Sequence, residues 1–117
     1  MERAGMGPGT PVGRYTYHLF SSRSEDDVVI FLYDAKADVI GQLFFVADDV
    51  PLPPAAETRG SVALYFPRSR LPAVMDMLRN EGPIELRWAG PLDSCLSTEY
   101  EPVGEGEGAA RRRAPAG

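Results

Sequence analysis

Two apolar runs near the middle of the chain, VVIFLY at residues 28–33 and VIGQLFFVA at residues 39–47, constrain its fold most strongly. Both are rich in β-branched and aromatic residues, which favours extended strands. Successive side chains of a strand point to opposite faces of a sheet. In the first run these two sets are Val28, Ile30 and Leu32 on one side and Val29, Phe31 and Tyr33 on the other. A sheet that contains these strands therefore needs cover on both of its faces.

Other segments extend this pattern to about six strands. Further strands are predicted at residues 14–21, 61–66, 84–88 and 94–100, and turn-forming residues separate them. The DAKAD segment at residues 34–38 has the length of a hairpin connection between the two apolar runs. Short links of this kind favour antiparallel neighbours.

The period of the apolar residues changes once, between the fourth and fifth strands. Apolar residues spaced i, i+3, i+4 and i+7 predict one helix over residues 70–81: Leu71, Val74, Met75 and Leu78. Ser69 is expected to cap its N-terminus, and Gly82 is placed for a C-cap before Pro83. Pro72 is tolerated because the first turn needs no hydrogen bond from its nitrogen.

The expected fold is therefore α+β, with an antiparallel sheet of about six strands in the order β-β-β-β-α-β-β. A helix of about 12 residues is about 18 Å long and covers much of one sheet face. For the other face, we expect either a curled sheet or a homodimer. The loop at residues 48–60 offers only Val50 and Leu52 as cover.

Both ends of the chain differ from this central part in composition. Residues 1–13 and 104–117 are rich in Gly and have few large apolar side chains. Such segments bury too little surface to offset the entropy lost on ordering. The sequence thus predicts one domain at residues 14–103 between an N-terminal and a C-terminal disordered tail.

The charge balance bears on the partners of the protein. The chain has 12 basic and 17 acidic residues, a net charge of −5. Nucleic-acid binders usually present a basic face, so this acidic balance disfavours nucleic acid as a partner. No apolar run is long enough to span a membrane, and the first ten residues lack the apolar core of a secretory signal. A cytoplasmic location is expected, and the unpaired Cys95 agrees with it.

Residues capable of catalysis or metal binding are few and scattered. The chain has one His, His18, and one Cys, Cys95, which together are the one candidate for thiol chemistry. Acidic clusters at residues 25–27, 34–38, 48–49 and 99–107 match no calcium-loop pattern. We therefore expect no catalytic constellation, no cofactor and no metal, and a protein that is not an enzyme.

Binding to protein, either to a second copy or to another chain, is the function that this pattern favours. The candidate interaction surface is formed by apolar residues of the strands and of the proline-containing loop: Tyr15, Tyr17, Phe31, Phe44, Val46, Leu52 and Tyr65. The alternative is a single-stranded nucleic-acid-binding protein whose sheet aromatics stack on bases. Its phosphate-binding residues would be Arg14, Arg68, Arg70 and Arg87.

The β-β-β-β-α order predicted for residues 14–82 resembles that of the Whirly-type single-strand-binding transcription factors. The resemblance rests on the element order, since no sequence motif of that family is present. It implies binding of single-stranded nucleic acid on the sheet.

Overall fold

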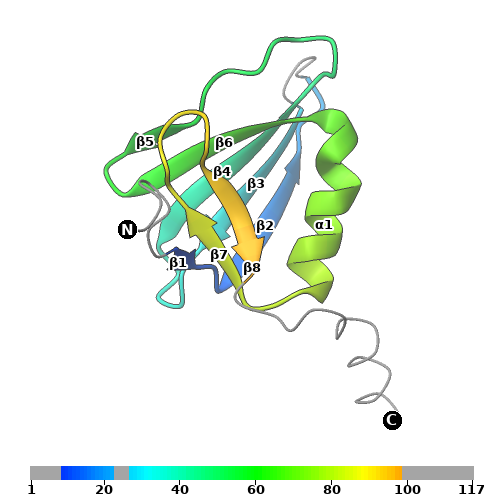
Figure 1. Ribbon diagram of the computed structural model, residues 1–117. Helices are drawn as coiled ribbons and strands as arrows, with labels where there is room; N and C mark the ends of the chain where they lie inside the picture. The colour runs from blue at the N-terminus through cyan, green and yellow to red at the C-terminus, as the bar shows by residue number, and fades with distance from the viewer. Residues whose placement is uncertain (1–8, 23–26, 99–117) are drawn as a thin grey trace, which may run out of the picture.

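A computed structural model of the chain describes residues 9–22 and 27–98. The two apolar runs form β3 (Val28–Tyr33) and β4 (Val39–Val46), an antiparallel hairpin in the middle of a five-stranded sheet (Figure 1). The Asp34 carboxylate closes the connecting turn, because its Oδ1 accepts the backbone N–H groups of Lys36 and Asp38, each at 2.9 Å. The predicted hairpin is confirmed.

The larger sheet has the strand order β2-β3-β4-β6-β5. β2 (Arg14–Leu19) runs antiparallel to β3, as predicted, whereas β6 (Ser61–Pro67) runs parallel to β4. The parallel pair arises because the chain leaves β4, crosses to the far edge and forms β5 (Ala56–Thr58). β6 then returns between β4 and β5. The expectation of a wholly antiparallel sheet is wrong, because the sequence Ala56-Glu57-Thr58 has no apolar alternation that would reveal β5.

A second, three-stranded sheet holds the remaining strands in the order β1-β7-β8. β1 (Thr10–Pro11) and β8 (Cys95–Thr98) pair with β7 (Ile84–Arg87), both antiparallel. The single six-stranded sheet expected from the sequence is therefore two sheets of five and three strands. β1 lies before residue 14, where the ordered domain was expected to begin. The predicted tail at residues 104–117 lies outside the described residues.

The helix α1 (Leu71–Asn80) lies within the predicted range and follows a 3-10 turn, η1 (Arg68–Arg70). Pro72 lies in the first turn, where a proline is tolerated. The expected caps differ from the structure. Ser69 lies inside η1, and its backbone N–H donates to Asp48 Oδ1 at 2.9 Å. The helix ends at Glu81 in extended backbone, without a left-handed glycine at residue 82.

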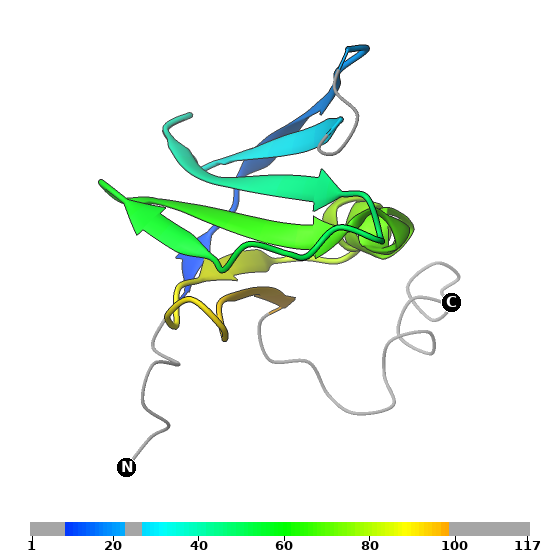
Figure 2. The ribbon, with the colours of Figure 1, turned by 90° about the horizontal axis from the view of Figure 1, so that it is seen from above.

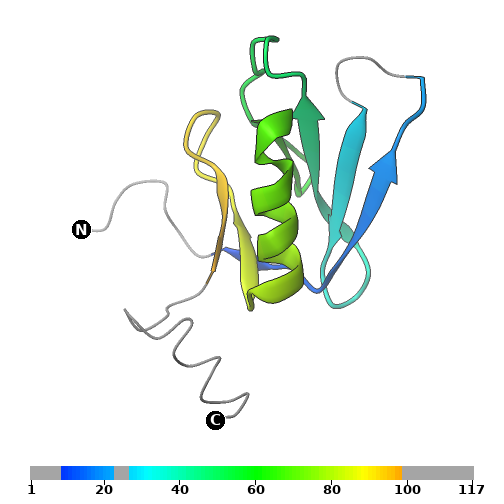
Figure 3. The same cartoon turned by 90° about the vertical axis from the view of Figure 1, so that its right-hand side faces the viewer.

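Both α1 and the three-stranded sheet pack on one face of the five-stranded sheet, which we call the inner face. In Figure 3, α1 stands in front of that sheet, with β2 and β3 on one side of it and β7 and β8 on the other. Val74 of α1 and Leu86 of β7 lie in one buried core with the inner-face side chains. The inner-face members of that core are Val28, Ile30, Leu32, Leu43, Phe45, Val62 and Leu64.

The β-β-β-β-α order behind the resemblance to Whirly-type proteins is not the observed one. β1 and β5 raise the number of strands before α1, and the crossover to β5 replaces the expected meander. Figure 2 shows the β7–β8 hairpin on one side of β6 and the β2–β3 hairpin on the other.

Candidate functional site

The opposite face of the five-stranded sheet, which we call the outer face, carries no helix or strand of the described residues (Figures 1 and 3). Its side chains alternate with those of the core along β2, β3, β4 and β6. They are Arg14, Thr16, His18, Val29, Phe31, Tyr33, Gln42, Phe44, Val46, Ala63 and Tyr65. Because apolar side chains of β3 and β4 point alternately to both faces of the sheet, they form part of this surface as well as the core.

Aromatic rings dominate the outer face. The rings of Phe44 and Tyr65, on neighbouring strands, stack with centroids 5.1 Å apart and planes inclined by 16°. The His18 ring meets Phe31 edge-on at 5.1 Å and lies parallel to Phe20 at 6.2 Å. These separations are typical of favourable aromatic pairs. Two ring clusters therefore occupy the outer face, one on β4 and β6 and one on β2 and β3.

Two valines of the outer face are buried, Val29 between the two clusters and Val46 at the end of β4, beyond Phe44. Val29 is 2% exposed and Val46 is 5% exposed, although no described helix or strand covers them. Phe31, Phe44 and Tyr65 themselves stay half-buried. The outer face is therefore a largely apolar surface whose rings are partly shielded from water.

Three polar side chains on this face, those of Thr16, His18 and Tyr33, are hydrogen-bonded to one another. The Thr16 hydroxyl lies 3.0 Å from His18 Nε2 and 3.0 Å from the Tyr33 hydroxyl, which makes a short hydrogen-bonded chain across β2 and β3. The sequence identifies His18 as the candidate partner of Cys95 and does not show its contact with Thr16 or the link to Tyr33. The i, i+2 spacing of Thr16 and His18 signals a shared face, but the contact with Tyr33 depends on strand register.

Charge on the outer face is sparse. Of its described residues, Arg14 alone carries a full charge, and it lies at one end of β2. At the opposite end of the sheet, Arg68 and Asp27 form an ion pair at 2.9 Å. A largely apolar surface with its charged groups at the margin is typical of a protein–protein interface.

The structure divides the predicted interaction surface into three parts. Phe31, Phe44, Val46 and Tyr65 come together on the outer face. Tyr15 and Tyr17 alternate with the outer-face residues of β2, so their side chains lie on the inner side of that strand. The seventh residue, Leu52, lies on the crossover loop.

Leu52 lines a shallow hollow on the inner side of the molecule. The hollow has a volume of about 450 Å³ and lies between the crossover loop and the β7–β8 turn. Its apolar lining includes Pro53, Pro54, Leu64 and Leu92. A backbone hydrogen bond of 2.9 Å from Ala55 N–H to Pro91 O joins the two loops. The proline-containing loop is therefore anchored to the second sheet and does not cover the outer face.

The candidate thiol pair is not brought together. His18 points to the outer face from β2, whereas Cys95 belongs to β8, in the sheet that packs on the inner face. A histidine base and a thiol nucleophile need hydrogen-bonding distance, so this arrangement excludes the pair.

Three acidic residues of the predicted clusters serve as structural partners in the described part of the chain. Asp34 closes a turn, Asp48 accepts the Ser69 N–H and Asp27 pairs with Arg68. Within residues 9–22 and 27–98, no group of three or more His, Cys, Asp or Glu side chains is arranged to hold a metal ion. No helix of this part is long and apolar enough to cross a membrane. The cluster at residues 99–107 lies outside the described residues.

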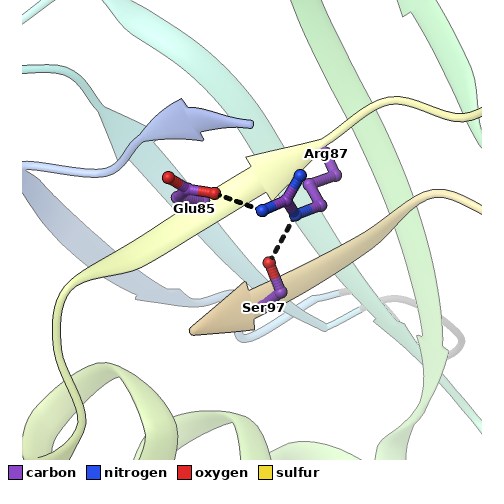
Figure 4. Close-up of polar contacts among 3 residues, drawn as sticks. All are labelled: Glu85, Arg87 and Ser97. Carbon is purple, nitrogen blue, oxygen red and sulfur yellow. Dashed lines mark hydrogen bonds and ion pairs between the residues drawn. The ribbon is translucent and has the colours of Figure 1, made fainter. Parts of the chain in front are cut away.

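Another polar cluster lies on the three-stranded sheet (Figure 4). Arg87 Nη2 donates to Glu85 Oε1 at 2.6 Å, and Arg87 Nε donates to Ser97 Oγ at 2.8 Å. Arg87 and Arg68, two of the four candidate phosphate-binding residues, are thus each engaged by a carboxylate. The cluster links β7 to β8 and stabilises their pairing.

Comparisons with protein-family models, with curated proteins and with solved structures found no match to this chain.

Proposed function

We propose that the protein acts by binding another protein through the outer face of its five-stranded sheet. The expected partner surface presents aliphatic and aromatic side chains and little net charge. The observation that supports this proposal is the pair of ring clusters, Phe44–Tyr65 and His18–Phe31, on a sheet face that no described helix or strand covers. Aromatic residues in a weakly charged surface are typical centres of binding energy in protein interfaces.

Charge favours a protein partner over single-stranded nucleic acid. A stacking surface for bases needs nearby cations to hold the phosphates. The outer face offers Arg14 at its margin, while Arg68 and Arg87 already face carboxylates. The net charge of −5 adds repulsion toward a polyanion. The proposal includes a cytoplasmic location and no catalytic role, which the single free cysteine and the dispersed titratable residues support.

Site-specific photo-crosslinking in the native cells tests this proposal. A benzophenone amino acid replaces Phe44 or Tyr65 on the outer face. A matched control carries it at Leu92, which is 87% exposed on the β7–β8 turn. We expect positions 44 and 65 to crosslink to the same protein and position 92 not to do so.

The crosslinked protein is then purified and titrated against wild-type protein and two variants by calorimetry. Phe44→Gln should weaken binding at least about tenfold because it removes a stacked ring from the interface. Leu92→Gln should leave the affinity unchanged. Equal crosslinking at all three positions, or equal affinity of wild-type protein and Phe44→Gln, would overturn the proposal. So would oligonucleotide binding that weakens with salt and is lost in Phe44→Gln.

A further inference from the structure

The two edges of the five-stranded sheet differ in how they are protected. β5 forms one edge; it has three residues, includes Glu57 and comes soon after Pro53-Pro54. Short length, charge and nearby proline are common ways to prevent pairing with another chain. β2 forms the other edge over six residues, without a proline or a register shift, and its one full charge is the terminal Arg14. In Figures 2 and 3, no described strand lies beyond β2.

Backbone pairing shows which groups of β2 face the open edge. The Phe20 N–H donates to Asp27 O at 2.7 Å, in line with the β2–β3 register. Hydrogen-bonded positions alternate along an antiparallel strand. The even-numbered residues of β2 therefore bond to β3, and the odd-numbered Tyr15, Tyr17 and Leu19 turn their N–H and C=O groups outward.

The same residues expose large apolar side chains. Leu19 is 68% exposed and Tyr17 is 44% exposed, whereas Tyr15 is half-buried against the core. A long edge strand with exposed apolar side chains and free backbone groups is a template for strand addition. The sequence of β2 itself indicates which strand would pair with this edge.

We propose that a second copy of this chain pairs with β2, antiparallel, about a twofold axis at Tyr17. This register uses all three outward residues, because Tyr17 lies opposite Tyr17 of the other copy and Tyr15 opposite Leu19. Both are apolar cross-strand pairs of the kind that stabilises sheets. Arg14 lies opposite Phe20, so the basic residues of the two copies do not face each other. On the outer face, Thr16 lies opposite His18, the residue with which it already shares a hydrogen bond.

In this dimer, the outer faces of the two copies lie on the same side. A twofold axis perpendicular to the sheet keeps the same face of both copies on the same side. The two five-stranded sheets then form one continuous sheet, and the two outer faces form one surface. The dimer stands independently of the protein-binding function proposed above, since it uses the edge of the sheet and not its face.

Substitutions of opposite charge at residue 17 test the dimer. Sedimentation velocity over about 1–200 µM, a range that brackets micromolar association, should show the full chain moving from monomer to dimer. Tyr17→Lys and Tyr17→Glu should each weaken the dimer at least about tenfold, because like charges would meet on the axis. An equimolar mixture of the two variants should form a heterodimer, detected by native mass spectrometry. This rescue requires residue 17 of one copy to face residue 17 of the other.

Val39→Lys and Val39→Glu are the matched controls, since Val39 is 40% exposed at the start of β4, away from the β2 edge. They should dimerise like the wild type. A wild-type protein that stays monomeric, or Tyr17 variants that dimerise normally, would overturn the inference. Failure of the mixture to form a heterodimer would overturn the register. A dimer lost in Phe44→Gln and kept in the Tyr17 variants would overturn this inference alone, because it would place the second copy on the outer face.

Discussion

At Ala37, in the turn between β3 and β4, hydrogen bonds from neighbouring residues fix an unfavourable backbone conformation. Ala37 has a φ of 70° in the β3–β4 turn, a left-handed conformation that costs a residue with a Cβ about 1–2 kcal/mol. Its backbone N–H donates to Asp34 O at 3.0 Å, while the Asp34 carboxylate holds the residues on either side of it. The hydrogen bonds of Asp34 thus hold Ala37 in this conformation.

Replacing Ala37 with glycine should therefore stabilise the protein. Glycine adopts a positive φ without steric cost, and part of the gain is offset by the greater entropy of the unfolded chain. We expect Ala37→Gly to raise the free energy of unfolding by about 0.5–1 kcal/mol in urea titrations. Ala35→Gly, in the same turn but without a positive φ, should lower it by a similar amount. Changes of the same sign in both variants would contradict this account.

Gly41 of β4 lies where the two sheets meet. A Cβ on Gly41 of β4 would lie 2.5 Å from Leu86 Cδ2 of β7 and 3.1 Å from Val62 O of β6. The absence of a side chain at Gly41 therefore lets β7 rest directly on the inner face. This contact helps to explain why β7 and β8 form a second layer instead of extending the larger sheet.

Adding one methyl group at this contact should separate the sheets. We expect Gly41→Ala to lower the free energy of unfolding by about 1–3 kcal/mol, the usual cost of overpacking a core. Gly82→Ala is the control, because a Cβ there meets no atom within 4 Å. It should change stability by less than about 0.5 kcal/mol. Chemical denaturation of both variants measures the difference, and equal effects would contradict the proposed role of Gly41.

At the scale of the whole molecule, an acidic chain presents two apolar surfaces of different kinds. The outer face is aromatic and half-buried, whereas the β2 edge offers outward-facing backbone groups and two exposed side chains. Both lie in one sheet, so association at the edge enlarges the face. The net charge of −5 opposes any association between two copies.

The net negative charge predicts how salt changes the affinity of the dimer. Screening reduces the repulsion between two acidic copies, so the dimer should tighten about two- to threefold between low and physiological ionic strength. Binding of a nucleic acid would weaken over the same range because counterions would be released. Sedimentation at several salt concentrations checks the prediction, and a dimer that weakens with salt would contradict it.

Local patterns in the sequence predicted the elements that depend on local forces. Unbroken apolar runs indicated β3 and β4, and the helical spacing of Leu71, Val74, Met75 and Leu78 indicated α1. Alternation also separated Phe31, Phe44 and Val46 from the core-facing residues of the same strands, because side-chain direction in a strand has a period of two.

Tertiary structure decided which strands pair, in which direction and in which layer. The parallel β4–β6 pair, the short β1 and β5 strands and the separate β7–β8 layer depend on contacts between distant residues, such as that of Gly41 with Leu86. The same contacts separate Tyr15, Tyr17 and Leu52 from the outer face. Secondary structure depends on the spacing of nearby apolar side chains, which can be seen in the sequence. Strand pairing depends on how closely surfaces from distant parts of the chain fit together, and local sequence patterns do not contain this information.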